Sequence, residues 1–435
     1  MSRVVSEVRI GTNLDLVYLI WTLMSGRLLE SRGAVIPGLS AFGLPEDAVR
    51  RSAAALTSGV FEIEPMVEQF RTVVDEEGRW EAHEHGGYRP VAVDLVGFSR
   101  PKLKGCPTKH YVSTANKAVP AIVVGIAGAV GSVGDQRLAV PRSMIESDPK
   151  DPSEKALMKA VPADVNAGLS LKEAIIVDRG FPLAAFVELE IERYVKRGRE
   201  NFKARRAEIH LKGRGRHPQQ GEIVRPLPRT YSGRVIEGTP CDREERWKEK
   251  TARGTTIWVR AAFWDDLVEE PGQEAFRCVV IWDPRYRRPL VLVTPLDASA
   301  QDLRRLYLDR WPIEGLPLIA KQMLGVHRQF VWGVKSRTLL PMLALLSGAI
   351  LSYLGATERP VATGFWDRSP RPTAGRLRRL LARVHFRDLP LPTHELRKKQ
   401  SPTAHLLKGI LAHRRRKSPL NPAQDPPQND LPLAA

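Results

Sequence analysis

The chain has 435 residues, of which 43% are hydrophobic and 27% are charged, as is typical of a globular protein of two to four domains. Its formal net charge is +18 at pH 7. A positive surplus of this size predicts a polyanionic partner, namely nucleic acid, because counterion release rewards many Lys and Arg contacts.

Cysteine usage excludes a disulfide framework and indicates a reducing compartment. The three cysteines lack CxxC spacing, so we expect no structural zinc site; they are Cys106, Cys241 and Cys278. His83 and His85 flank Glu84, where we expect a solvated loop and not a metal cluster. The first 30 residues lack the order of charges and apolar residues that marks a signal peptide.

Residues 1–86 are expected to be helical. The stretch NLDLVYLIWTLMSGRLLE has apolar residues at helical spacing. A turn and a second helix follow, with Pro45, Glu46 and Asp47 suited to its first turn. Either a helix-turn-helix that binds DNA ends or a plain helical bundle is consistent with this pattern.

From Tyr88 the pattern changes to strands. VAVDLVGF places Asp94 in a short apolar run, and AIVVGIAGAVGSVGDQRLAVP predicts two strands around a turn that contains Gly131 and Gly134. SEKALMKAVPADV is then expected to be a helix, and EAIIVD a buried strand that ends at Asp178. Mixed strands and helices of this kind indicate an α/β fold.

Residues 205–297 predict a β-rich block. Strand-like runs such as TTIWVRAAFW, FRCVVIWD and PLVLVTPL alternate with Pro and Gly turns. A basic stretch overlaps the start of this block. Residues 196–216 hold nine Lys or Arg against two Glu, a net of +7. Ser299 to Asp302 then predict a capping box at the start of a helix.

The most informative segment is YLDRWPIEGLPLIAKQMLG, which that helix leads into. Tyr307, Arg310, Glu314 and Lys321 follow one another at steps of three, four and seven residues, which return to one face of a helix. A single acid between a phenol and two cations is a poor pattern for a core. It suits a surface that binds phosphate beside a metal-binding carboxylate.

The spacing matches the signature called YREK, and the segment therefore resembles the bacterial cut-and-paste transposases of the DDE class. The stretch Asp178, Arg179, Gly180, Phe181 matches the run that commonly follows the second acid of that family. The resemblance implies a ribonuclease-H-like mixed-sheet core with Asp94, Asp178 and Glu314 as catalytic residues. These three acids would hold two Mg²⁺ ions, for which Mn²⁺ can substitute.

The same resemblance implies contacts with DNA phosphates from Tyr307, Arg310 and Lys321, and Arg179 is assigned to the DNA-binding set. An exposed amphipathic helix face is the alternative explanation of the first three. Trp311 is expected to pack beneath the site. In the family an aromatic residue of the β insertion can stack on a flipped base; Trp258, Trp264 and Trp282 are candidates, although each is more often sheet core.

Two prolines depart from the pattern. Pro312 fits the first turn of a new helical segment that carries Glu314, whereas Pro317 predicts a kink before Lys321. They motivate an alternative to an active enzyme, a catalytically inactive DNA-binding protein derived from a transposase. A third option is a structure-specific nuclease on the same fold.

The C-terminal third contains one apolar and one basic segment. Residues 338–356 carry no charge and approach transmembrane length, but we expect a buried core helix. Residues 371–417 hold fourteen Lys or Arg against two acids, a net of +12. The last eighteen residues are rich in Pro, Asn and Gln, which predicts disorder.

These patterns together predict five parts: an N-terminal helical DNA-binding domain (1–86), a ribonuclease-H-like catalytic core (87–204 and 298–356), a β-rich insertion (205–297), a basic helical C-terminal region (357–417) and a disordered tail (418–435). The implied activity is metal-dependent cleavage and strand transfer at the inverted-repeat ends of an insertion sequence. The expected partner is double-stranded DNA, both transposon ends and target. We expect a homodimer on DNA and no membrane association, in the bacterial cytoplasm beside the nucleoid.

Overall fold

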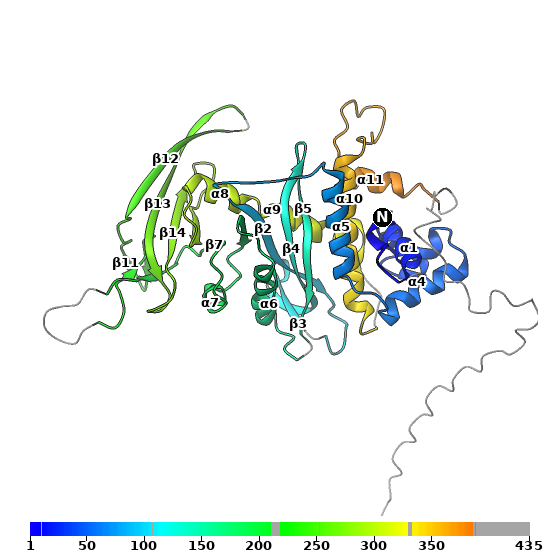
Figure 1. Ribbon diagram of the computed structural model, residues 1–435, viewed down its shortest axis with the longest axis horizontal. Helices are drawn as coiled ribbons and strands as arrows, with labels where there is room; N and C mark the ends of the chain where they lie inside the picture. The colour runs from blue at the N-terminus through cyan, green and yellow to red at the C-terminus, as the bar shows by residue number, and fades with distance from the viewer. Residues whose placement is uncertain are drawn as a thin grey trace, which may run out of the picture.

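The structure is a computed structural model that describes residues 1–9, 11–106, 108–148, 150–209, 218–251, 253–328, 333–385 and 388. It confirms a mixed α/β protein in which one large sheet has both parallel and antiparallel strands (Figure 1). Most of the basic segment 371–417 and the whole tail 418–435 lie outside the described residues, as do residues 210–216 of the first basic stretch.

The strands have the following bounds: β1 (Glu81–Ala82), β2 (Arg89–Ser99), β3 (Thr108–Val112), β4 (Lys117–Val133), β5 (Gln136–Glu146), β6 (Glu173–Val177), β7 (Tyr194–Arg197), β8 (Ala204–Arg206), β9 (Ile223–Val224), β10 (Arg229–Tyr231), β11 (Arg234–Ile236), β12 (Arg243–Lys250), β13 (Thr256–Val268), β14 (Phe276–Trp282) and β15 (Leu290–Thr294).

The α-helices are α1 (Thr12–Met24), α2 (Arg27–Glu30), α3 (Val35–Ala41), α4 (Glu46–Ser58), α5 (Glu64–Glu77), α6 (Glu154–Ala167), α7 (Leu183–Glu188), α8 (Ala300–Leu308), α9 (Trp311–Leu318), α10 (Ser336–Thr357) and α11 (Ala374–Leu381). Short turns of other helix types are η1 (Arg3–Val5), η2 (Ser113–Ala115), η3 (Ile319–Met323) and η4 (Val326–Arg328).

Strand β2 lies in the middle of the first half of the sheet. It pairs antiparallel with β4 and parallel with β6, while β5 pairs with the other side of β4 and β7 runs parallel beside β6. The β-rich block predicted at 205–297 is confirmed as β-rich. It continues the same sheet, because β15 pairs with β7 and is followed by β14 and β13.

The hairpin of β4 and β5 turns at Gly134 and Asp135, as its sequence predicted. Gly131, which the sequence assigned to the turn, lies inside β4 opposite β1. A Cβ atom there would lie 2.1 Å from the backbone oxygen of Glu81 and 2.6 Å from the ring of Trp80. The glycine is therefore explained by the close approach of a neighbouring strand and not by a turn.

The two faces of β2 bury different cores because side chains alternate along a strand. Val91 and Val93 belong to the core beneath α6, whereas Ala92 and Val96 belong to a core shared with α9, α10 and the N-terminal helices. Figure 1 shows α5 and α10 side by side between the sheet and the remaining N-terminal helices. The N-terminal helices thus share one continuous core with this half of the sheet.

Helix α10 contains the apolar segment expected to be a core helix. Within the described part of the chain it is the one helix long and apolar enough to cross a membrane, and 78% of its most apolar window is buried inside the fold. Burial of this extent is typical of the core helix of a soluble protein.

Helices α8 and α9 cover the α10 side of the sheet near the end of β2. The N-cap half of the capping box predicted before α8 is confirmed: the hydroxyl of Ser299 accepts a hydrogen bond from the Asp302 N–H at 3.1 Å. Pro312 lies in the first turn of α9, as predicted, where its missing N–H costs nothing. The interruption expected at Pro317 is a change of helix type, because α9 ends at Leu318 and continues as the π turn η3.

Candidate active site

The sheet places the two aspartates at matching positions on neighbouring parallel strands. Strand β2 pairs with β6 in a register that runs from Arg89 with Glu173 to Ala92 with Ile176. The same offset of 84 residues relates Asp94 to Asp178, two positions farther along. Two carboxylates therefore meet at the end of β6, where the chain leaves the sheet.

Glu314 joins them from α9. Ile313 and Leu316 of this helix are buried in the core under β2, which directs the intervening turn toward the sheet. The carboxylates of Glu314 and Asp178 are both close enough to raise the pKa of Asp94. The structure thus places all three acids that the sequence proposed as catalytic within electrostatic range of Asp94, from positions 84 and 136 residues apart, although their oxygens are not gathered within 4.8 Å.

The pKa of Asp94 is raised from 3.8 to about 6. Burial is the largest cause, and the neighbouring carboxylates add to it, while the guanidinium of Arg310 and the N–H of Leu95 oppose the shift. The charge of Arg310 lowers the pKa more than either carboxylate raises it, so the loss of solvent around Asp94 is the main reason for the shift.

Asp178 is perturbed in the opposite direction. Burial alone would raise its pKa, but the N–H of Arg179 and the charge of Arg310 outweigh burial and hold the pKa below its ordinary value. The hydroxyl of Tyr307 also donates to Asp178 Oδ1 at 3.1 Å. Arg197, at the end of β7, lies 3.8 Å from the same oxygen. Arg197 belongs to the basic stretch noted in the sequence, but its place beside Asp178 follows only from the fold.

Tyr307 and Arg310 are almost fully buried, with 4% of each residue exposed. This excludes the exposed amphipathic face as an explanation of their spacing. Tyr307 faces Asp178, and Arg310 forms an ion pair of 2.6 Å with Glu314. Their contacts with DNA phosphates stay predictions, since both side chains bind carboxylates in this structure.

Lys321 and Arg179 occupy different surroundings. The ammonium of Lys321 lies 5.3 Å from the centroid of the Phe98 ring, and its burial lowers its pKa although the charge of Asp94 opposes this. Lys321 therefore lies on the Asp94 side of the site despite Pro317. Arg179 is exposed directly after Asp178, where it can reach a ligand in solvent.

Three expectations for aromatic residues are resolved. Trp311 was expected to pack beneath the site, and this is wrong, because it is 55% exposed beside Arg310. In the insertion Trp264 is sheet core and Trp282 is partly buried. Trp258 is 59% exposed on β13, with the ammonium of Lys248 5.0 Å from its ring centroid, so sheet core is wrong for this residue.

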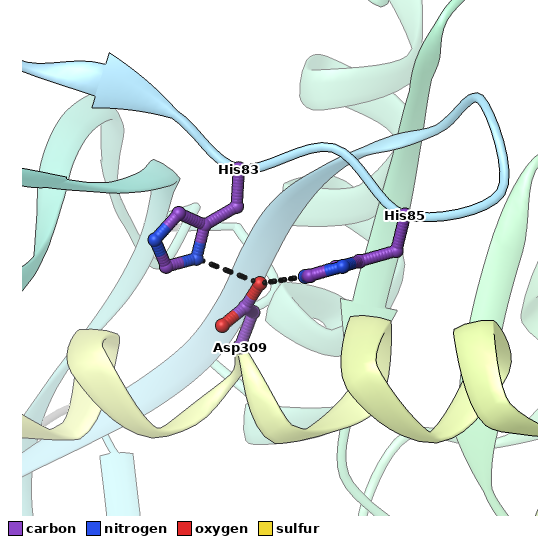
Figure 2. Close-up of side chains that lie close together, drawn as sticks. All are labelled: His83, His85 and Asp309. Carbon is purple, nitrogen blue, oxygen red and sulfur yellow. Dashed lines mark hydrogen bonds and ion pairs between the residues drawn. The ribbon is translucent and has the colours of Figure 1, made fainter.

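The solvated loop expected at His83 and His85 is also wrong. Figure 2 shows both imidazoles directed at the carboxylate of Asp309, which lies between α8 and α9. The Nδ1 of His83 is 3.0 Å and the Nε2 of His85 is 2.8 Å from the same oxygen, Oδ2. Arg137 binds the other oxygen. The spacing of the histidines hinted at a shared direction, but Asp309 is more than 220 residues away in sequence.

The three acids suit a hard divalent cation. Mg²⁺ prefers carboxylate and water oxygens, and Asp94, Asp178 and Glu314 supply such oxygens from neighbouring positions, although their oxygens do not all lie within 4.8 Å of one another. A bound cation would stabilise the ionised form of Asp94, whose pKa is raised mainly by burial. The residue types present suit the ions that the resemblance implied, but the three acids would have to draw closer together to hold them.

Burial of Asp94 should also be visible in stability. The folded protein keeps the proton up to pH about 6, whereas the unfolded chain loses it near 3.8. The contribution of Asp94 to the free energy of unfolding is thus fully present below pH 3.8, and it is lost as the pH rises through about 6. Without divalent cations, Asp94→Asn should raise the free energy of unfolding at pH 7.5 by up to about 3 kcal/mol, and by much less at pH 4. Urea denaturation at both pH values tests this, and an equal gain at both would contradict it.

No protein-family model matches the chain, and a search of curated proteins found no match.

Proposed function

We propose that the protein is a DDE transposase that cleaves the ends of its element and joins them to target DNA. The observation that carries this proposal is the convergence of Asp94, Asp178 and Glu314 from two strands and a helix, with Tyr307 and Arg310 bound to two of them. Three acids around one buried arginine would be a costly way to stabilise a fold, and they suit a site for cations and phosphate.

The arrangement of the sheet supports a ribonuclease-H-like core. An antiparallel hairpin next to β2, then α6, then the parallel strand β6, is the order that such a core requires. Its two acids stand on β2 and directly after β6, and the third comes from a helix that covers the same part of the sheet.

Each residue has a proposed task. Bound Mg²⁺ or Mn²⁺ would neutralise charge on the phosphorus oxygens and position the nucleophilic oxygen. Asp94, Asp178 and Glu314 would hold these ions. Arg310 would leave Glu314 and bind a phosphate, because a guanidinium forms paired hydrogen bonds with either group. Lys321 would contribute a single positive charge. Exposed Trp258 is the insertion tryptophan best placed to stack on a flipped base.

The remaining parts of the proposal concern the partners. Transposon ends and target DNA would be bound as duplexes by a homodimer assembled on DNA, in the bacterial cytoplasm. The net charge of +18 supports a DNA partner and predicts salt-sensitive binding.

The decisive experiment incubates the full-length protein with a supercoiled plasmid that carries the DNA flanking its own gene. We expect nicks or breaks at the element ends and strand-transfer products, both only with Mg²⁺ or Mn²⁺. Cleavage without strand transfer would favour the structure-specific nuclease. Salt-sensitive binding with no cation-dependent nicking would favour the inactive DNA-binding protein and refute the proposal.

A further inference from the structure

We infer that His83, His85 and Asp309 form a second cation site, which takes a transition-metal ion of the zinc class. This inference uses none of the acids assigned to DNA cleavage. It goes beyond the proposed function, and it can be true whether or not the protein cuts DNA.

The ligand atoms of the three residues all lie within 4.8 Å of one another, and both histidine nitrogens approach one oxygen of Asp309 (Figure 2). Zinc lies about 2.0–2.2 Å from such atoms, so neighbouring tetrahedral ligands are roughly 3.3 Å apart. The two N–O separations of 3.0 and 2.8 Å need to open by a few tenths of an ångström, and the two histidine nitrogens, which lie within 4.8 Å of each other, need to settle at a similar spacing to admit the ion.

Hydrogen bonds from neighbouring strands hold the three ligand residues in place. The backbone N–H of His83 donates to Val130 of β4, and His85 exchanges backbone hydrogen bonds with Tyr88. Arg137 of β5 holds Oδ1 of Asp309 and also donates to the carbonyl of Leu308, which leaves Oδ2 for the two imidazoles. Carboxylate ligands of metals are commonly fixed by such an outer hydrogen bond.

The types of ligand atom decide which metal the site would take. Two imidazole nitrogens and one carboxylate oxygen suit Zn²⁺, Co²⁺ or Ni²⁺ better than Mg²⁺, which prefers oxygen ligands alone. Each histidine side chain is 21% exposed while that of Asp309 is 4% exposed. A water molecule can therefore complete the four ligands from the solvent side.

The site would fix the junction of α8 and α9. Asp309 stands between Tyr307, which binds Asp178, and Arg310, which binds Glu314. An ion would connect this junction to His83 and His85, which lie just before β2. Asp94 lies on β2. Without an ion, two neutral imidazoles can each donate an N–H to Oδ2, and this is the alternative that the experiment must separate.

The test titrates Co²⁺ into untagged, full-length protein freed of metal, without DNA. We expect one equivalent to give the visible absorption of tetrahedral Co²⁺, which Zn²⁺ then abolishes by displacement. His83→Gln and His85→Gln should each lose this absorption. Gln keeps a donor for Asp309, and the melting curve of each variant verifies that it folds.

Two controls match these changes. His110→Gln alters another imidazole beside a carboxylate, 3.2 Å from Glu154, and should keep the full signal. Asp94→Asn should keep it as well, because it alters only the acidic site. An absent signal in the wild type, or the same signal in His83→Gln and His85→Gln, would overturn the inference and leave the proposed DNA reaction unaffected.

Discussion

Replacing any one of the three converging acids is expected to abolish cation-dependent DNA cleavage. Asp94→Asn, Asp178→Asn and Glu314→Gln keep shape but remove a charge that holds the cations. Loss of cation-based charge stabilisation is worth several kcal/mol, so we expect cleavage rates to fall at least about 10³-fold. The measurement is the initial rate of nicking at the element ends in saturating Mn²⁺.

DNA binding separates this effect from unfolding. Removing a negative charge near phosphates should leave affinity unchanged or slightly tighter in a gel-shift assay. Asp164→Asn is the matched control, because Asp164 lies on α6 on the opposite face of the sheet, where it binds Ser143. If one of the three variants cuts at the rate of this control, its residue is not part of the site.

Replacing Arg310 is expected to make folding depend on divalent cations. Arg310→Met keeps most of the apolar stem but removes the guanidinium that lies among the acids. Breaking an ion pair with one buried partner should lower the free energy of unfolding by about 3 kcal/mol without cations, the low end for a buried pair, since the side chain of Glu314 is 37% exposed. Mg²⁺ should restore much of this loss, since it replaces the missing positive charge.

Arg304→Met is the control for this prediction. The side chain of Arg304 is 6% exposed and binds Asp283 at 2.6 Å, but it lies on α8 away from the three acids. Both variants should melt at lower temperature without cations. Only Arg310→Met should gain more from Mg²⁺ than the wild type does, and equal gains in both variants would contradict the account.

Local pattern was sufficient for the elements around the acids. An apolar run that contains Asp94 and another that ends at Asp178 predicted the strands, and the Ser299 cap and Pro312 predicted where α8 and α9 begin. The YREK spacing, a property of neighbouring turns, gave Glu314 alone, and Asp94 and Asp178 were grouped with it through the family resemblance. The parallel register that aligns Asp94 with Asp178 is a property of the sheet, which no local pattern contains.

The errors concern contacts between distant segments. The periodicity of the sequence does not predict that His83 and His85 contact Asp309. Asp309 is brought next to them by the packing of α8 against the sheet. Trp311 was expected in the core because it is large and apolar. Ile313 and Leu316 occupy the buried face of α9, so Trp311 faces solvent. Trp258 and Trp264 are six residues apart and lie on the same face of β13, so alternation cannot distinguish them, and only the fold decides which part of that face is covered.

A crystal structure of the full-length protein grown with Mn²⁺ would show whether the three acids hold cations. We expect anomalous density among the carboxylates of Asp94, Asp178 and Glu314, with Arg310 displaced from Glu314. Carboxylates that keep their contacts with Arg310 and Tyr307 at saturating Mn²⁺, with no ion among them, would contradict this expectation.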